Sequence, residues 1–244
     1  MNFESVLRER RSIRQFKQDP VSDELIQSLL EQALASPSSS NTQPYRIAVA
    51  TGEIRNELKQ QLSRKFLNAN AINRSAMPLK LIKGVLSNDL PDGDFKPNNQ
   101  YPKELKKRAS ECGHGLYSTL GIARQDIRSR DQQMLRNFEF FDAPVAIFLF
   151  IQERLGVYSA LDGGIFLQSL MLAATNMGLG TCTQGALGLW SSPIKKLFDV
   201  PKDYKLICGL SLGYPDPEHA INRFQPHKRS IDELILPLKN RFGQ

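Results

Sequence analysis

The sequence contains few of the residues from which metal sites and disulfide frameworks are built. Its 244 residues include only three cysteines and three histidines. The cysteines are Cys112, Cys182 and Cys208, and the histidines are His114, His219 and His227. An odd number of widely separated cysteines, without a C-x-x-C pair, argues against a disulfide framework. The histidines lack the spacing of zinc ligands, so we predict no metal site.

Long hydrophobic runs are also missing. No uninterrupted apolar run approaches the roughly 18 residues that a membrane span requires. The best candidate, residues 143–151, is far shorter and fits a buried strand. The first residues, Met1-Asn2-Phe3-Glu4, contain no apolar signal core. We therefore expect a cytoplasmic protein that has no membrane partner.

Several common catalytic and nucleotide-binding motifs are absent. The sequence has no G-x-G-x-x-G after a strand, no G-x-x-x-x-G-K-[ST] and no G-x-S-x-G. The isolated histidines have no evident nucleophile beside them. A Rossmann or P-loop site and acyl-transfer chemistry are therefore not supported, and we predict no catalytic side chain.

The charge balance is basic, with a formal net charge of +7. A basic surface can bind nucleic acid. Here, however, the basic residues are spread along the chain and alternate with acidic ones. We therefore favour a solvated surface with a local anion-binding site over a nucleic-acid partner.

The apolar spacing predicts a single α+β domain over residues 1–244, with a small central sheet flanked by helices. Helices are expected from the Ser22 cap to Pro37, over 54–66, about 103–124 and 160–177, and at Ser192-Pro193, with strands over 45–50, 144–151 and 206–212. Strand 144–151 is apolar on both faces and should be central. Helix 160–177 is apolar nearly all round and should be buried, and part of its cover could come from a second subunit. Residues 84–102 should form a long loop, and long loops are often lids.

The segment Arg10-Arg11-Ser12-Ile13-Arg14 is the first candidate binding feature. If it is helical, Arg10 and Arg14 point the same way. Guanidinium groups suit phosphate, and the Ser12 hydroxyl adds a donor. Taken alone, the segment also fits a solvated basic turn.

Three further features follow along the chain. Residues 37–44, P-S-S-S-N-T-Q-P, place short polar side chains on a loop bounded by prolines. Residues 178–185, G-L-G-T-C-T-Q-G, would let the backbone approach a flat ligand closely. A late basic group, Arg223, His227, Lys228 and Arg229, could add phosphate contacts. Taken singly, they also fit a helix-to-strand connection, a helix C-cap with its turn, and a polar tail.

Taken in order, these features resemble the FMN-dependent nitroreductase family over about residues 3 to 235. The segment 136–141, R-N-F-E-F-F, is similar to a branch that carries a helical insertion, here about 66–135. The resemblance implies a nitroreductase-like fold and an interlocked homodimer with FMN at the interface. It also implies hydride transfer from NADH or NADPH, through FMN, to a nitroaromatic, a quinone or a similar electron-poor small molecule.

The resemblance implies cofactor contacts at Arg10, Arg11, Ser12, Arg14, Ser38, Ser39, Asn41, Gln184, Gly185 and Arg229. Arg10 and Ser12 would hold the FMN phosphate, and Arg14 would lie by the pyrimidine edge of the flavin. Ser38, Ser39 and Asn41 would come from the partner subunit. Gln184 and Gly185 would present their backbone near N5. Arg229 would clamp the phosphate again, with His227 and Arg223 as alternatives.

Other functions remain open at this point. The same fold could serve a non-catalytic flavin-binding protein or a reductive dehalogenase, and a basic nucleic-acid-binding protein is a third class. Phe66, Tyr117, Leu120 and Phe138 are candidate pocket walls, although plain core packing is the favoured explanation for each. The sequence does not distinguish NADH from NADPH or identify the acceptor.

Overall fold

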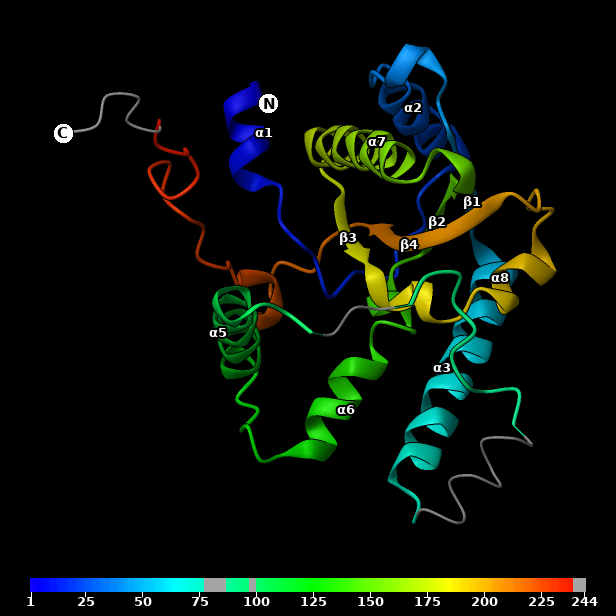
Figure 1. Ribbon diagram of the computed structural model, residues 1–244, viewed down its shortest axis with the longest axis vertical. Coiled ribbons are helices and arrows are strands. Elements are labelled where there is room, and N and C mark those ends of the chain that lie inside the picture. The colour runs from blue at the N-terminus through cyan, green and yellow to red at the C-terminus, as the bar shows by residue number, and fades with distance from the viewer. Residues whose placement is uncertain (77–86, 97–99, 239–244) are drawn as a thin grey trace.

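A four-stranded antiparallel sheet forms the centre of the molecule. The computed structural model describes residues 1–76, 87–96 and 100–238. The strands are β1 (Tyr45–Ala50), β2 (Val145–Gln152), β3 (Gly180–Gln184) and β4 (Tyr204–Gly213), in the order β1-β2-β4-β3. Helices cover both faces (Figure 1). The predicted α+β fold with a small sheet between helices is confirmed.

Strand β2 is central, as its sequence predicts. Its side chains alternate between two hydrophobic clusters, with Phe148 and Phe150 in one and Ile147 and Leu149 in the other. Successive residues of a strand face opposite sides of a sheet, so a strand apolar on both faces must be covered on both. Helices α2 (Asp23–Ala33) and α7 (Val157–Asn176) cover one side, and α3 (Gly52–Arg74) and α8 (Ser192–Leu197) cover the other (Figure 1).

Two helix starts test the predicted caps. The hydroxyl of Ser22 accepts a hydrogen bond from the backbone N–H of Leu25 at 3.3 Å, as expected of an N-cap. That helix ends at a C-cap on Leu34, before it reaches Pro37. The cap of α8 is Ser191 rather than the predicted Ser192.

Strand β3 was missed because the glycines of residues 178–185 resemble a turn. Gly178 does end α7, with φ of 78°, but a strand begins two residues later. The predicted helix over about 103–124 ends earlier than expected, and a further helix that the sequence did not predict follows it. Helix α5 (Lys103–Thr119) is followed by Gly121 at φ of 66°, and α6 (Ile127–Leu135) begins after Asp126. A left-handed residue interrupts the helical path, so the predicted helix stops at Thr119, and α6 begins only beyond its predicted end.

Helix α7 is less enclosed than its composition predicts. Val157, Tyr158 and Leu161 are 74%, 65% and 57% exposed, while Leu170 on the opposite side is fully buried. By length and mean hydropathy (1.3) alone, α7 is long and apolar enough to cross a membrane. In this structure 39% of that stretch is buried. This property was not expected from the sequence. Its buried side packs against α2 and the sheet, as a core helix does.

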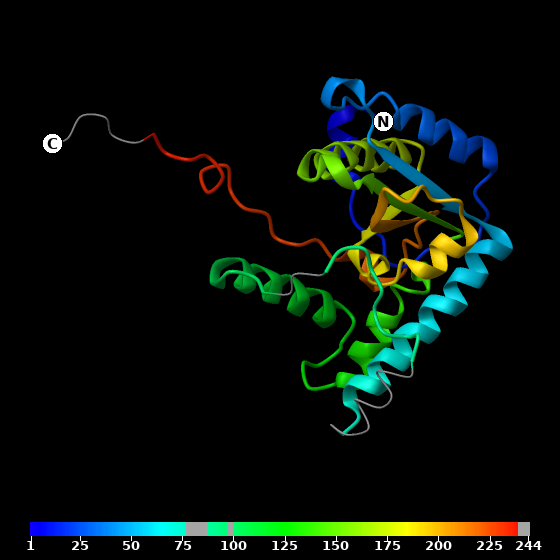
Figure 2. The same cartoon turned by 45° about the vertical axis from the view of Figure 1, so that its right-hand side comes forward.

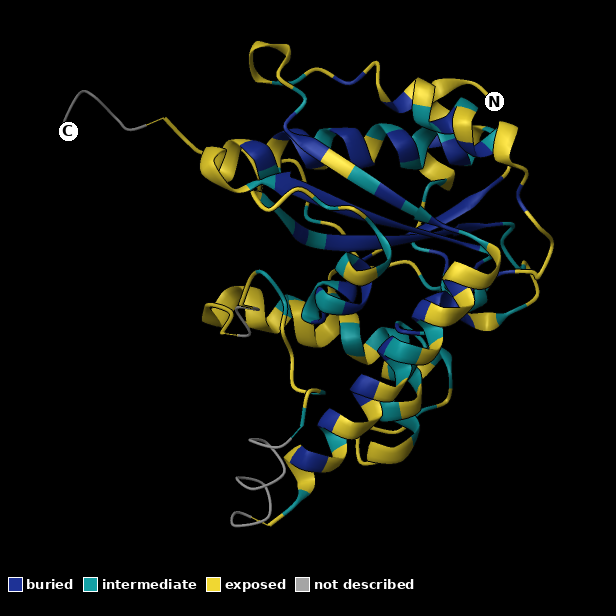
Figure 3. Ribbon diagram, turned by 90° about the vertical axis from the view of Figure 1, so that its right-hand side faces the viewer, coloured by how far each residue is buried: buried dark blue, intermediate teal, exposed yellow. Residues whose placement is uncertain are grey.

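The insertion and the tail extend away from the sheet. Helices α5 and α6 contain no buried residue, and this part of the chain is largely coloured as exposed or intermediate in Figure 3. After η5 (Ala220–Arg223) the chain runs outward (Figure 2). The outer tail carries exposed apolar side chains at Ile231, Leu234, Ile235, Leu236 and Leu238.

Candidate functional site

Residues 10–14 are extended rather than helical, so the helical interpretation of this segment is wrong. Ser12 forms a parallel bridge with Thr181 of β3, and the Ile13 N–H donates to the Thr181 carbonyl at 2.9 Å. Ile13 is buried and faces Gly180. Its neighbours Ser12 and Arg14 instead line a cavity. The extended segment thus brings Arg10 and Arg14 to one cavity, which helical spacing was expected to do.

A buried asparagine fixes the chain just after Ser12 and Ile13. The Arg14 N–H donates to Oδ1 of Asn222 at 2.8 Å. Nδ2 of Asn222 donates to the carbonyls of Gln15 and Asp216, both at 2.8 Å. Asn222 therefore joins the N-terminal segment to the C-terminal region. Nothing in the local sequence marks this residue, because its role depends on contacts with residues about 200 positions away.

The cavity beside residues 10–14, which we call the basic cavity, has a volume of about 270 Å³. It is lined by residues 7, 8, 10–12, 14, 224–226 and 228. Arg8 pairs with Glu4. Within the described part of the chain, Arg10, Arg11, Arg14 and Lys228 form no salt bridge, and no carboxylate lines the cavity. Several unpaired cations in one concave site fit an anion such as a phosphate.

The late basic residues are placed differently from one another. Arg229 pairs with Glu104 of α5. Arg223 donates to the carbonyl of Glu218 at 3.2 Å, and the carbonyl of His227 accepts from Arg108 at 3.3 Å. Among these late residues, only Lys228 lines the basic cavity. The structure therefore brings Lys228 to Arg10, and it places Arg229 against the insertion.

Gln184 and Gly185 lie where β3 ends. The Gln184 side chain is buried, and its Nε2 donates to the Asn137 carbonyl at 2.8 Å while its Oε1 accepts from Ser211 at 2.5 Å. Gly185 is exposed, and a Cβ built on it would meet no atom within 4 Å. The side chain of Gln184 is thus fully engaged, and the backbone around Gly185 is open to a ligand.

The loop that carries Ser38, Ser39 and Asn41 and the basic cavity lie at opposite edges of the sheet. The loop precedes β1, at one edge, whereas residues 10–14 lie along β3, at the other. The loop is held to α7 because the Ser39 N–H donates to Asp162 at 3.1 Å. Asn41 adopts a positive φ of 55°. One chain therefore does not bring Ser38, Ser39 and Asn41 to Arg10.

A second hollow, which we call the aromatic cavity, has a volume of about 410 Å³. Its walls include Phe66, Tyr117, Arg130, Phe138 and Leu189. Phe66 and Phe138 are stacked with ring centroids 4.8 Å apart. Leu189 ends η4 (Gly185–Leu189), so the cavity adjoins the turn that starts at Gly185. Three of the four predicted wall residues thus meet here, and Leu120 does not line this cavity.

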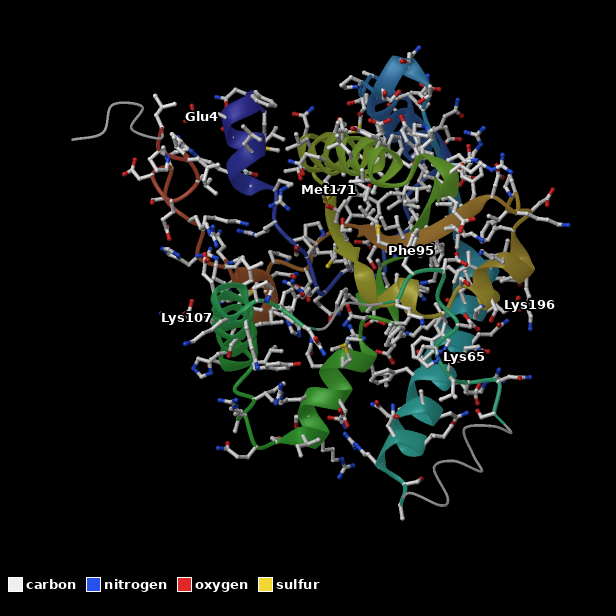
Figure 4. The ribbon with its side chains drawn as sticks, viewed as in Figure 1. Glu4, Lys65, Phe95, Lys107, Met171 and Lys196 are labelled. Atoms are coloured by element: carbon white, nitrogen blue, oxygen red, sulfur yellow. The ribbon has the colours of Figure 1, made fainter. Side chains whose placement is uncertain are left out.

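Residues 87–96, which we call the strap, hold η4 and α8 from outside. The Asp92 carboxylate accepts from the N–H groups of Ser191 and Ser192 at 2.8 and 3.1 Å. The indole of Trp190 donates to the Asp89 carbonyl at 3.0 Å. Lys65, labelled in Figure 4, lies 3.6 Å from Asp92. The strap falls within the predicted loop 84–102 and has no helix or strand, while positions 84–86 and 97–99 lie outside the described residues.

The environment of Asp92 favours its charged form. Burial alone raises the pKa of this carboxyl, but hydrogen bonds from Ser192 and Ser191 and the charge of Lys65 together lower it below the ordinary value. Gly93 also approaches the Gly188 carbonyl so closely that a Cβ would lie 2.2 Å from its oxygen. The strap is thus packed against η4, and Gly93 permits that approach.

Comparison with known proteins places this architecture among characterised ones. The model of the Nitroreductase family matches residues 7–214. A 4-nitrobenzoate reductase of Pseudomonas putida is 35% identical over 91% of this chain and 88% of its own length. A nitrobenzene nitroreductase of Ectopseudomonas oleovorans is 33% identical over 95% of each chain. The crystal structure of the FMN-dependent nitroreductase NfnB from Mycobacterium smegmatis in complex with NADPH is similar with a TM-score of 0.83, 28% identity and coverage of 97% of each chain.

Proposed function

Because this chain belongs to the nitroreductase family, we propose that it is an FMN-dependent oxidoreductase that passes hydride from NADPH or NADH to a nitroaromatic or similar electron-poor molecule. The observation that carries this proposal is the basic cavity. Its unpaired arginines belong to the segment 10–14, which runs beside β3, the strand that ends before the open backbone of Gly185. Relatives that reduce 4-nitrobenzoate and nitrobenzene support the acceptor class. A structural relative that binds NADPH and depends on FMN supports the donor and the cofactor.

The residues present fit a flavin mononucleotide. Arg10, Arg11, Ser12 and Lys228 line a cavity suited to its phosphate. We assign Arg14 to the pyrimidine edge, where a fixed cation would stabilise negative charge. When bound, FMN supplies the hydride chemistry, and the protein supplies binding, orientation and electrostatics. The hydrogen bond from the Arg14 N–H to Asn222 holds this part of the backbone in place.

We further propose that the working form is a homodimer in the cytoplasm. Ser38, Ser39 and Asn41 lie at the opposite sheet edge from the basic cavity, so a second chain would have to bring them to the cofactor. The exposed apolar face of α7 supports such an interface. For the cytoplasm, the support is three cysteines, Cys112, Cys182 and Cys208, that are free thiols in the structure.

The test begins with the absorbance spectrum of the purified protein. We expect a yellow protein that is bleached by NADPH or NADH without oxygen and regains its colour when 4-nitrobenzoate or nitrobenzene is added. A flavin-loaded protein that consumes no nicotinamide cofactor with either acceptor would instead favour a non-catalytic flavin-binding protein. A colourless protein that does not take up FMN would overturn the proposal.

The phosphate contacts are tested by measuring FMN affinity in single variants. Arg10→Ala should raise the Kd by about tenfold or more, since a charge-assisted hydrogen bond contributes about 1.5–3 kcal/mol. Lys228→Ala and Arg229→Ala distinguish the late candidates. A larger loss for Lys228→Ala would follow from the basic cavity, whereas a larger loss for Arg229→Ala would support the contact implied by the resemblance. An unchanged Kd for Arg10→Ala would contradict the assignment of Arg10.

A further inference from the structure

The aromatic cavity is continuous in its lining with another hollow on the insertion. This neighbour, which we call the arginine cavity, has a volume of about 430 Å³ and is built from the second half of α5, the following turn and α6. Tyr117 and Arg130 line both cavities. The Arg130 side chain therefore lies where a ring in one cavity would extend a substituent toward the other.

Arg130 is held in place, but most of its donors are unused. Its guanidinium carbon lies 4.9 Å from the centre of the Tyr117 ring. One terminal nitrogen donates to the Arg124 carbonyl at 3.2 Å. Its Nε is buried and has no hydrogen-bond partner among the described residues. A buried donor without a partner is costly, and beyond the bond to Arg124 the terminal nitrogens of Arg130 donate to no described residue, so donors remain for an acceptor group.

The other charges around these cavities are already compensated or of the same sign. Asp131, which lines the aromatic cavity, pairs with Arg74. Glu111, which lines the arginine cavity, lies 3.9 Å from Lys107. Arg124 adds a second cation to the arginine cavity. In the described part of the chain, Arg130 forms no salt bridge. The local field around Arg130 thus favours an anion.

We propose that Arg130 binds an anionic substituent, such as a carboxylate, on an aromatic acceptor whose ring lies in the aromatic cavity. A planar guanidinium fork matches a carboxylate in two parallel hydrogen bonds. Phe66, Met134 and Leu189 supply apolar walls for the ring. This inference rests on the proposed function. It makes Arg130 the residue that favours aromatic acids over neutral nitroaromatics as acceptors.

The experiment compares 4-nitrobenzoate with nitrobenzene, which differ by one carboxylate. Arg130→Gln should lower kcat/KM for 4-nitrobenzoate by roughly 10- to 100-fold, and it should change the value for nitrobenzene by less than about threefold. Arg130→Lys should lose less, because it keeps the charge but not the fork. Binding of 4-nitrobenzoate to the oxidised FMN-loaded protein, followed by the flavin absorbance, should weaken in parallel.

Arg128→Gln provides the matched control. Arg128 is an exposed residue of the same helix and lines neither cavity, so its loss removes the same charge without affecting the site. We expect this variant to treat both acceptors as the unmodified protein does. Similar losses for 4-nitrobenzoate in Arg128→Gln and Arg130→Gln would mean that net charge, rather than the cavity, sets the preference.

Three outcomes would overturn the inference and leave the proposed function standing. They are equal effects of Arg130→Gln on both acceptors, no effect on either, and an effect confined to the KM for NADPH. The last result would place Arg130 at the phosphate of the nicotinamide donor. Failure of the unmodified protein to reduce any nitroaromatic would instead overturn the proposed function itself.

Discussion

Two glycines, one at the start of β3 and one just after its end, have opposite packing constraints. A Cβ added to Gly180 would lie 2.6 Å from Cγ1 of Ile13, whereas one added to Gly185 would meet nothing within 4 Å. Gly180 therefore allows the segment 10–14 to lie against β3. Gly185 is not required by the packing of one chain, which agrees with the proposal that a ligand approaches the backbone there.

These constraints predict different defects for the same substitution. Gly180→Ala should destabilise the protein by about 1–3 kcal/mol through overpacking, seen as a lower Tm. Gly185→Ala should leave the Tm of the flavin-free protein unchanged, and it should raise the Kd for FMN by about tenfold, or ~1.4 kcal/mol. Tm and flavin titration measure the two effects separately. An unaltered Kd in Gly185→Ala would show that the backbone there does not face the cofactor.

At this scale, the sequence predicted residues whose chemistry is visible locally. Arg10, Ser12 and Arg14 were identified because cations and a hydroxyl at close spacing suit phosphate, and they do line one cavity. Asn222 and Arg130 were not identified. Their importance comes from a buried bridge and from a position between two cavities, which exist only after the chain has folded.

Among the elements, the turn before β2 has three consecutive non-glycine residues in the left-handed region. Phe140, Phe141 and Asp142 all have positive φ, at 56°, 53° and 65°, and aromatic residues rarely adopt this conformation. Arg136 donates to Asp142 at 2.8 Å and to Glu139 at 2.9 Å. These ion pairs hold the left-handed turn, and the two phenylalanines are buried beneath it.

The turn should make stability depend on acid pH. Burial raises the pKa of Asp142, but hydrogen bonds from Arg136 and Lys59 outweigh it and lower the pKa from 3.8 to about 2. A lowered folded-state pKa stabilises the protein above about pH 4, and the stabilisation is lost as the pH falls toward 2. Asp142→Asn should therefore cost about 1–2 kcal/mol in urea unfolding at pH 7, and this difference should shrink at pH 3.

Glu153→Gln is the control for this prediction. Glu153 pairs with Lys205 at 3.4 Å, but its side chain is 59% exposed, and exposed ion pairs contribute little. We expect at most a small change in the free energy of unfolding at either pH. An equal pH dependence in the unmodified protein and in Asp142→Asn would contradict the assignment to Asp142.

Elements were predictable where one periodicity ran without interruption. The cap at Ser22, the first strand and the central strand follow from side-chain chemistry and apolar spacing. Strand β3 did not, because its glycines and polar residues suit contact with residues 10–14 rather than a typical strand pattern. The break at Gly121 was hidden within a continuous polar helical pattern.

The whole molecule carries its predicted cofactor contacts on opposite edges of one sheet. The sequence identified the loop 37–44 and the segment 10–14 as separate features. The order of residues along the chain does not tell whether these two features meet within one chain or only between two chains. The sheet order separates them within a chain. The apolar pattern of α7 predicted a buried helix, but one side of it is exposed in a single chain. That exposed apolar side is a surface on which a second copy could pack.

A charge on that surface should separate the proposed dimer into single chains. Leu161→Glu should shift the mass in light scattering from twice 27.5 kDa to that of a single chain, because an apolar contact is replaced by a desolvated carboxylate. The variant should also release FMN. Leu67→Glu on α3 is the matched control, since Leu67 is 52% exposed and Leu161 is 57% exposed. A flavin-loaded single chain would rule out a shared site.

Residues 224–229 of the C-terminal region also contact the insertion. Arg229 pairs with Glu104, Arg108 donates to the His227 carbonyl, and Phe224 lies against Gly115, all three at α5. A ligand that holds Lys228 therefore restrains the same short stretch that anchors α5, whose Tyr117 lines the aromatic cavity. Coupling free energies between two binding events are reciprocal. If binding of an acceptor reorders α5, it should change the affinity for the proposed phosphate group by some factor. Binding of the phosphate group must then change the affinity for the acceptor by the same factor.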